Sequence, residues 1–373
     1  MTNALTYLDY NATAPVHPAV VDAMAATLTE VGNPSSVHQA GRHARDLVEA
    51  ARGRLATLLN CLPRQIVFTS GGTEANALAL RGLPAARRFV SMVEHESVLA
   101  NAGDAVRLPV DAAGVVDGEA LSAALATAGP GPKLVSIMLA NNETGVIQPI
   151  AALAARCRAG GAWLHVDAVQ ALGRISVDVA ALGADLLTVS AHKIGGPKGV
   201  GALVIANDLL TLTPLYGGGG QELGRRAGTE NVPGITGFAA ALDALAAMPE
   251  WTARAATLRD ALEAALMEAG GRVFARAIDR LPTTTAVRMP GVKAETQVMA
   301  FDLAGIAVSA GAACSSGKVR VSHVLRAMGL DDASAGETIR ISLGWGTTAA
   351  EIDRLVAEWR RIAARVARRP AAE

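Results

Sequence analysis

The chain has 373 residues, 34 of them Lys or Arg and 34 Asp or Glu, and it is 51% hydrophobic but only 3% aromatic. This length exceeds what one ordinary hydrophobic core needs, so we expect a large domain and a smaller one. The balanced charge argues against a nucleic acid or an anionic membrane surface as a partner.

The N-terminal residues lack a basic segment followed by an apolar core, so no signal peptide is expected. No run approaches the roughly 18 apolar residues of a membrane span. Three cysteines, Cys61, Cys157 and Cys314, are odd in number and far apart, which disfavours a disulfide framework. We therefore expect a cytoplasmic protein.

Strand-like and helix-like segments alternate over the first two thirds of the chain. The expected strands are 65–69, 88–92, 133–139, 162–166, 185–189 and 201–205, and a helix is expected over 73–80. Such alternation predicts an α/β fold with a mostly parallel sheet covered on both faces.

The remaining segments predict a smaller α+β domain. A long connecting helix over 251–269 is followed by strands at 283–289, 306–309 and 338–343 and by helices at 295–303, 322–328 and 349–368. We expect residues 14–250 to form the large domain, and residues 1–13 with 251–373 to form the small one.

Two tetrapeptides that close neighbouring strands carry the strongest functional signal. Residues 167–170 (DAVQ) follow one apolar run and residues 190–193 (SAHK) follow the next. Lys193 can form a Schiff base with an aldehyde cofactor, and Asp167 can keep a pyridinium nitrogen protonated. Alone, Asp167 is a typical helix N-cap and Lys193 a typical surface lysine. Their conjunction, with Gln170, Ser190 and His192, predicts a site for pyridoxal phosphate (PLP).

Other motifs lie where strands end. A glycine-rich turn around Gly72 and Thr73 precedes a helix, which suits an anion, although a plain capped turn is also compatible. His95 can stack on a planar ring or cap a helix. Asn142 can face a ligand at the sheet edge or simply form a turn. Thr229, after the glycines of 217–220, belongs by itself to a polar turn.

Two residues of the predicted small domain are candidates for a role in chemistry or ligand binding. Cys314 is flanked by Gly, Ala and Ser, so its thiol is predicted to be unhindered and its loop mobile, unlike Cys61 and Cys157. From the residues alone, a reactive thiol and an inert one are both compatible with this setting. Arg340 lies inside an expected strand and requires an anionic partner, either a substrate carboxylate or a structural ion pair.

Taken together, these motifs resemble the NifS/IscS-like cysteine desulfurases of the class-V aminotransferase family, which are fold type I PLP enzymes. The matching segments run nearly end to end: 7–15 (YLDYNATAP), 32–36 (GNPSS), 68–74 (FTSGGTE), 94–95 (EH), 141–145 (NNETG), 165–170 (HVDAVQ), 190–199 (SAHKIGGPKG), 226–229 (RAGT), 313–317 (ACSSG), 322–329 (SHVLRAMG) and 339–344 (IRISLG). The cysteine loop distinguishes desulfurases from other members.

The resemblance implies a role for each candidate. Catalytic roles fall to Lys193 as the Schiff-base lysine, Cys314 as the sulfur acceptor, and His95, which stacks on the ring and relays protons. Asp167 pairs with the pyridine nitrogen and Gln170 with the ring hydroxyl. The phosphate is held by Gly72, Thr73, Ser190 and His192, with Thr229 from the second subunit of a homodimer. Asn142 and Arg340 face the cofactor and the substrate carboxylate.

By the same resemblance, L-cysteine becomes L-alanine, and the sulfur stays on Cys314 as a persulfide for an acceptor protein such as an iron–sulfur scaffold. The chain ends soon after its last expected helix, where IscS-type members carry a longer tail that helps dock the scaffold. Ala191 and Ala227 replace residues that are often Gly and Ser in relatives. Lys318 and Arg320 make the cysteine loop more basic than in many relatives.

Two rival interpretations stay open. A selenocysteine lyase, β-lyase or aminotransferase would keep Lys193 and Asp167 without needing Cys314. A scaffold protein with this fold would need no chemistry, but an intact set of Lys193, Asp167 and Cys314 argues against it.

Overall fold

A seven-stranded sheet forms the centre of the large domain in the computed structural model, which describes residues 5–84, 86–310 and 321–367. The strand order is β2 (Ile66–Thr69), β8 (Gly201–Ile205), β7 (Leu186–Ser190), β6 (Trp163–Asp167), β5 (Lys133–Met138), β3 (Arg87–Ser91) and β4 (Val106–Leu108). β8 runs antiparallel to both of its neighbours, and the other pairs are parallel. The predicted mostly parallel α/β fold is confirmed.

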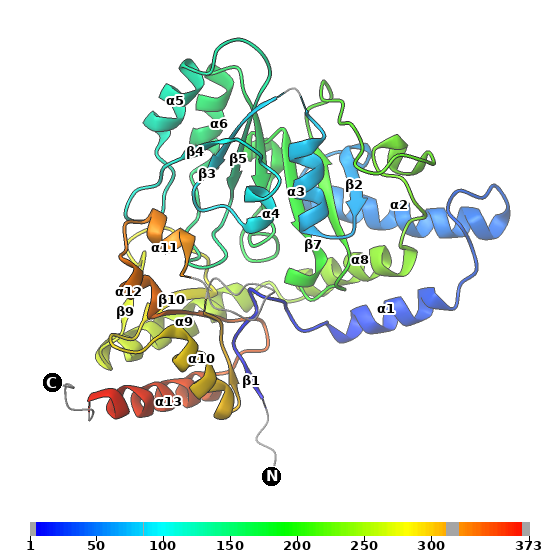
Figure 1. Cartoon of the computed structure of the whole chain (residues 1–373). Helices are drawn as coiled ribbons and strands as arrows, with labels where there is room; N and C mark the ends of the chain where they lie inside the picture. The colour runs from blue at the N-terminus through cyan, green and yellow to red at the C-terminus, as the bar shows by residue number, and fades with distance from the viewer. Residues whose placement is uncertain (1–4, 85, 311–320, 368–373) are drawn as a thin grey trace.

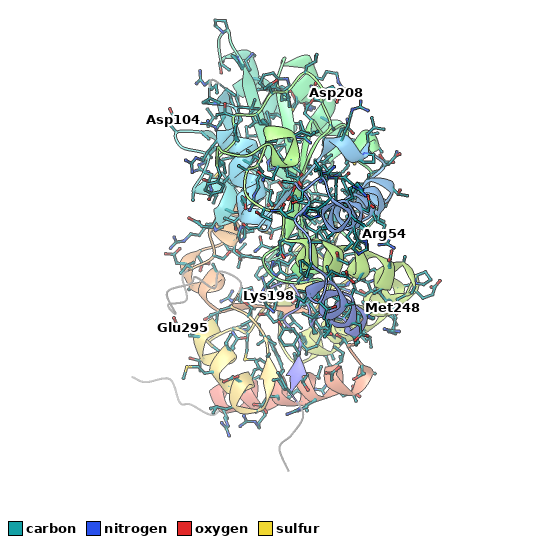
Figure 2. All side chains as sticks on the ribbon, turned by 90° about the vertical axis from the view of Figure 1, so that its right-hand side faces the viewer. Arg54, Asp104, Lys198, Asp208, Met248 and Glu295 are labelled. Atoms are coloured by element: carbon teal, nitrogen blue, oxygen red, sulfur yellow. The ribbon has the colours of Figure 1, made fainter. Side chains whose placement is uncertain are left out.

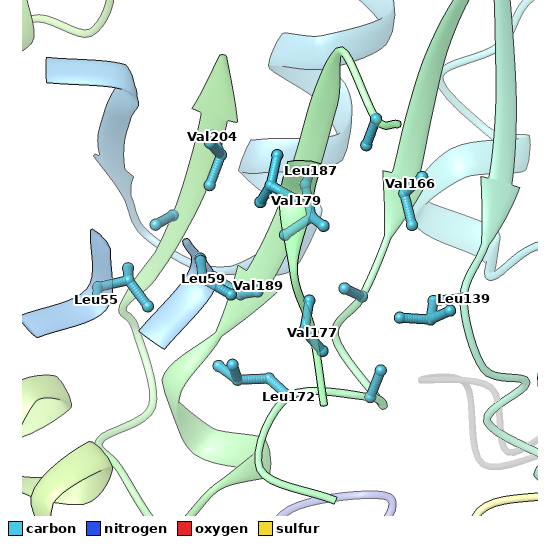
Figure 3. Close-up of a cluster of buried hydrophobic side chains, with 14 of the residues drawn as sticks. Leu55, Leu59, Leu139, Val166, Leu172, Val177, Val179, Leu187, Val189 and Val204 are labelled. Atoms are coloured by element: carbon cyan, nitrogen blue, oxygen red, sulfur yellow. The ribbon is translucent and has the colours of Figure 1, made fainter. Parts of the chain in front are cut away.

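Helices cover both faces of this sheet (Figure 1). They are α1 (Pro18–Leu28), α2 (Gln39–Leu59), α3 (Gly72–Arg81), α4 (Glu96–Leu99), α5 (Gly118–Ala126), α6 (Ile150–Ala159), α7 (Val179–Leu182) and α8 (Val232–Ala246). Successive strand residues point to opposite faces, so Leu186 and Leu203 pack in one apolar cluster while Leu187 and Val204 pack in another. Figure 3 shows part of the second cluster, where side chains from α2, β6, β7 and β8 meet.

The small domain has its own core. β9 (Arg272–Val273), β10 (Thr284–Arg288) and β12 (Thr338–Ser342) form an antiparallel sheet, and β1 (Thr6–Tyr7) pairs in parallel with β11 (Ile306–Ala307). Its helices are α9 (Trp251–Glu268), α10 (Ala294–Leu303), α11 (His323–Ala327), α12 (Asp332–Gly336) and α13 (Ala349–Ala367). Trp359 of α13 is fully buried among apolar residues of α9, α10 and the strands.

The two cores are joined through a sharp bend between α8 and α9, near the exposed loop that carries Met248 (Figure 2). α8 packs on α1 and α2, whereas α9 packs on α13. This packing supports a division into residues 14–250 and residues 1–13 with 251–373, which stays a proposal.

No single helix in the described part of the chain is long and apolar enough to cross a membrane. Among the described helices, only α8 and α9 taken together are long and apolar enough, and this pair is bent by 73°.

The elements that the sequence patterns predicted are observed within two residues of their expected ends. The expected strand 201–205 and the helix over 251–269 are observed as β8 and α9, and the expected strand at 306–309 is shorter, as β11. The patterns did not predict α1, α2, α5, α6 or α8. α8 is mostly apolar around its whole circumference because it is buried between other helices, so its sequence shows little amphipathic period.

Candidate active site

A cavity of about 240 Å³ opens where β5, β6 and β7 end and α3 begins. Its lining includes nine residues that the sequence predicted: Gly72, Thr73, His95, Asn142, Asp167, Gln170, Ser190, His192 and Lys193. It also includes four that the sequence motifs did not single out: Asn76, Ser97, Met138 and Val169. Parallel strands bring their carboxyl ends to one edge of a sheet, and here that edge forms the floor of the cavity.

One end of the cavity is suited to an anion. α3 begins at Gly72, and its N-cap Gly71 has φ 149° and offers no side-chain hydrogen bond to the helix. Opposite, the Ser190 hydroxyl is buried without a hydrogen-bond partner among the described residues. A β-carbon on Gly72 would lie 2.9 Å from Val169 Cγ2, so glycine keeps this wall open. Free helix N–H groups and a spare hydroxyl fit a phosphate group.

Asp167 is the last residue of β6, and its carboxylate is held from both sides. Oδ1 accepts the Val169 N–H at 2.9 Å, and Oδ2 accepts the Asn76 side-chain amide at 2.7 Å. Deeper in the sheet, burial lowers the pKa of His165 to about 4, so this neighbour is neutral. The position and fixed orientation of Asp167 fit an ion pair with a protonated ring nitrogen.

Lys193 follows β7 in a short 3₁₀ turn (Ala191–Lys193) that directs its amine into the cavity. Nζ donates to the main-chain oxygens of Asn11 at 2.6 Å and Ala12 at 2.9 Å. Burial lowers its pKa to about 7, and the positive charges of Arg340 and Arg174 add to the effect. A substantial fraction of this amine is therefore neutral near pH 7, as a nucleophile or proton acceptor must be.

His192 and Gln170 have partners of their own on the cavity wall. Burial, followed by the charge of Lys193, lowers the pKa of His192 to about 4, and its Nδ1 lies 3.2 Å from Thr13 Oγ1. Gln170 donates from Nε2 to Asn11 O at 3.0 Å, and its side-chain oxygen accepts from Arg174.

Arg340 is committed to partners within the chain. Its guanidinium lies 2.6 Å from Asp9 Oδ1 and donates to Asn142 O at 3.0 Å, while its Nε is buried without a partner among the described residues. The structural ion pair that the sequence left open is therefore present. The free Nε and the location beside Asn142 are compatible with a further anion at this side.

Of the predicted site residues that the structure describes, Arg340 and Thr229 do not line the cavity. Thr229 is exposed on a loop. Cys314 lies outside the described residues, but both flanks of its segment are placed. Ser309 and Arg340 exchange backbone hydrogen bonds of 3.1 and 2.7 Å. After the segment, Ser322 donates to Glu143 Oε2 at 2.5 Å. Both flanks thus attach beside the cavity rim.

Several site residues were missed because their signal is weak. Asn76 lies in the helix after the glycine turn, Ser97 in α4, and Arg174 in a turn after β6. Asp9 belongs to an N-terminal motif that the resemblance already covered. A polar residue in an otherwise apolar stretch, such as Asn76 within α3, was the signal that could have found them.

Comparison with known proteins agrees with this geometry. The family model described as aminotransferase class-V matches residues 6–355. A cysteine desulfurase of Cereibacter sphaeroides is 44% identical, over 94% of this chain and 93% of the relative. An IscS-like cysteine desulfurase of Mycobacterium tuberculosis is 40% identical, over 94% of both. The crystal structure of a NifS-like protein from Rickettsia africae superimposes with a TM-score of 0.90 at 36% identity, covering 96% of this chain and 99% of that one.

The chain therefore belongs to the class-V aminotransferases, PLP-dependent enzymes of fold type I. Within that family it falls in the cysteine desulfurase group. This cofactor fits the site in four ways. The Ser190 hydroxyl has no partner among the described residues, the N-terminus of α3 is open, the Asp167 carboxylate is fixed, and the Lys193 amine is partly neutral.

Proposed function

We propose that the protein is a PLP-dependent cysteine desulfurase that converts L-cysteine to L-alanine and receives the sulfur on Cys314. The observation that carries this proposal is that Lys193 and Asp167 line one cavity where two adjacent parallel strands end, with both flanks of the Cys314 segment attached beside the same cavity. In the overall reaction the C–S bond of the substrate breaks and an S–S bond to Cys314 forms. The products are alanine and a Cys314 persulfide, with no external oxidant or reductant required.

Residues on three sides of the cavity would hold the cofactor. Gly72, Thr73, Ser190 and His192 would bind the phosphate. Asp167 would keep the ring nitrogen protonated, Gln170 would donate from Nε2 to the ring oxygen, and His95 would lie against the ring. When bound, PLP supplies an electron sink for the negative charge that develops at the substrate Cα.

Lys193 would be both the covalent anchor and the proton acceptor at Cα. Its amine can take a proton because burial and nearby guanidinium groups hold its pKa at about 7. Asn142 and the Nε of Arg340 would contact the substrate carboxylate. Cys314 would attack the substrate sulfur as a thiolate, since the thiolate is the nucleophilic form of cysteine.

A homodimer is part of the proposal. Thr229 is exposed and lies outside the cavity of its own chain, so its predicted phosphate contact would be made to a second copy. Exposed apolar side chains support an interface: Val31 and Val37 are each 83% exposed and Leu223 is 75% exposed. Residues 34, 35 and 223 line one surface hollow, which brings the two segments together.

The sulfur acceptor would be a protein thiol in iron–sulfur cluster assembly or in another pathway that makes sulfur-containing products. The relative from Archaeoglobus fulgidus is named IscS 1 and is 42% identical. Cys61 and Cys157 are free thiols, which fits a reducing, cytoplasmic location.

Measuring sulfide and alanine formed from L-cysteine with a thiol reductant tests the proposal. Wild type should form both in equal amounts, and Cys314→Ala should lose them while keeping the absorbance of bound PLP. Cys61→Ala is the control, because burial raises the pKa of that half-buried thiol to about 11 and leaves it inert at neutral pH. Turnover that survives Cys314→Ala would instead assign the protein to the PLP-dependent lyases.

A further inference from the structure

Among the described residues, hydrogen-bond partners lie on one side of the His95 ring only. His95 caps the N-terminus of α4, and its Nδ1 accepts the main-chain N–H of Ser97 at 3.1 Å. The Ser97 hydroxyl lies 2.8 Å from the same nitrogen. A main-chain N–H can only donate, so Nδ1 must present a lone pair. The hydrogen of a neutral ring then sits on Nε2, for which no described residue provides a hydrogen bond.

Asn76 independently determines which atom donates in the contact between the Ser97 hydroxyl and His95 Nδ1. Its side-chain nitrogen lies 2.7 Å from Asp167 Oδ2 and 2.9 Å from Ser97 Oγ. An ionised carboxylate only accepts hydrogen bonds, so the amide must turn its nitrogen, not its oxygen, toward Asp167. The second hydrogen of that nitrogen is donated to Ser97 Oγ. The hydroxyl hydrogen of Ser97 is therefore left for His95 Nδ1.

We infer that Asn76 and Ser97 are positioning residues that hold His95 as a neutral ring with its single hydrogen on Nε2. The chain of donors runs in one direction, from Asn76 through Ser97 to the ring. All three side chains line the cavity together with Asp167. The inference rests on the proposed function only in that the cavity is taken to be the active site.

Burial of the ring favours its neutral state, and the charged groups around it act in both directions. Burial lowers the pKa of His95 and is the largest influence. The carboxylates of Asp167, Glu96 and Glu143 oppose this effect, and the amine of Lys193 reinforces it. A proton added to Nδ1 would also have to break both hydrogen bonds from Ser97.

This arrangement restricts what His95 can do. Its Nε2–H can donate a hydrogen bond to a substrate or cofactor atom, and any group that contacts it must be an acceptor. His95 cannot take a proton at Nε2 unless the ring first changes tautomer. Proton acceptance in the cavity then falls to Lys193, whose amine is partly neutral near pH 7.

Nitrogen-15 NMR of the histidine-labelled holoenzyme tests the inference, because a protonated ring nitrogen and a bare one have well-separated shifts. His95 is assigned by loss of its signals in His95→Gln, among the seven histidines of the chain. We expect a bare Nδ1 and a protonated Nε2 at neutral pH. A bare Nε2 in the wild-type protein would overturn the inference.

Variants test the two positioning residues. Ser97→Ala and Asn76→Leu should shift the tautomer ratio of His95 by about tenfold, which corresponds to one lost hydrogen bond. Ser97→Thr, which keeps a hydroxyl, should restore the wild-type ratio. Ser122→Ala removes a helical hydroxyl that bonds Gly118 O and Arg156, and should change nothing at His95. Unchanged ring shifts in both Ser97→Ala and Asn76→Leu would refute their role.

The proposed function and this inference can fail separately. If sulfide release survives Cys314→Ala, the desulfurase proposal is lost, but a bare Nδ1 still supports the positioning of His95. If the desulfurase assay behaves as expected and Nε2 is bare, only the positioning is wrong.

Discussion

Lys193 should destabilise the cofactor-free protein, and replacing it with methionine should remove that cost. Its pKa falls from an ordinary 10.5 to about 7 in the folded chain because the amine is buried near two guanidinium groups. Between these pH values the unfolded chain binds the proton and the folded chain does not. The stability of the wild-type protein therefore rises with pH over this window, and the full penalty applies below pH 7.

The size of the effect follows from the width of the window. A difference of 3.5 units between 10.5 and 7 corresponds to at most about 5 kcal/mol. At pH 6 the free energy of unfolding of Lys193→Met should exceed that of wild type, and this difference should be about 2.5 kcal/mol smaller at pH 9. At the lower pH the variant should be the more stable protein.

Urea unfolding of both cofactor-free proteins, at one protein concentration and at both pH values, measures this difference. Lys198→Met is the control, since Lys198 is exposed on the same loop and its replacement should change the free energy of unfolding little. A Lys193→Met advantage that is the same at both pH values would refute the argument. So would a variant less stable than wild type at the lower pH.

Three further outcomes are expected at other sites. Ser190→Ala removes a buried hydroxyl without a partner among the described residues, so urea unfolding should show the cofactor-free protein stabilised by about 1 kcal/mol. The same variant should retain PLP about tenfold less tightly, as measured by PLP release. Arg174→Met should free the Gln170 amide to rotate and alter the absorption band of bound PLP, a change that Arg174→Lys should reduce. Glu263→Ala should cost about 3–5 kcal/mol in urea unfolding, because it leaves the Arg280 guanidinium, 4% exposed, without its carboxylate. Equal stabilities of Glu263→Ala and wild type would contradict the last expectation.

The central sheet could be predicted from local sequence because its strands are short apolar runs that end in polar turns. β6 and β7 end on Asp167 and Ser190, one residue beyond the strand ends that the sequence predicted. Their adjacency also follows from the alternation of strands and helices, which favours a parallel sheet with neighbouring crossovers. The proximity of Lys193 and Asp167 could therefore be predicted from the order of the strands alone.

The N-terminal contribution to the site could not be placed in this way. Asp9 pairs with Arg340, 331 residues later in the chain, and Asn11 provides the main-chain oxygen that holds Lys193. No periodicity connects such distant segments. The contact between Asp9 and Arg340 depends on how the two ends of the chain fold together in the proposed small domain, and the contact between Asn11 and Lys193 depends on how that domain meets the large one. The sequence could not decide whether Arg340 pairs with a carboxylate of the chain or with one of a ligand, because Asp9 is far from Arg340 in the sequence.

The sequence by itself thus determined the α/β architecture, the family, and the identity of the residues at the strand ends, because each depends on local pattern or on matching motifs. The tertiary structure decided the state of those residues: which nitrogen of His95 carries the hydrogen, which way the Gln170 amide points, and why the Lys193 amine is partly neutral. Hydrogen-bond direction and desolvation depend on the three-dimensional surroundings of each atom, and these exist only once the chain has folded.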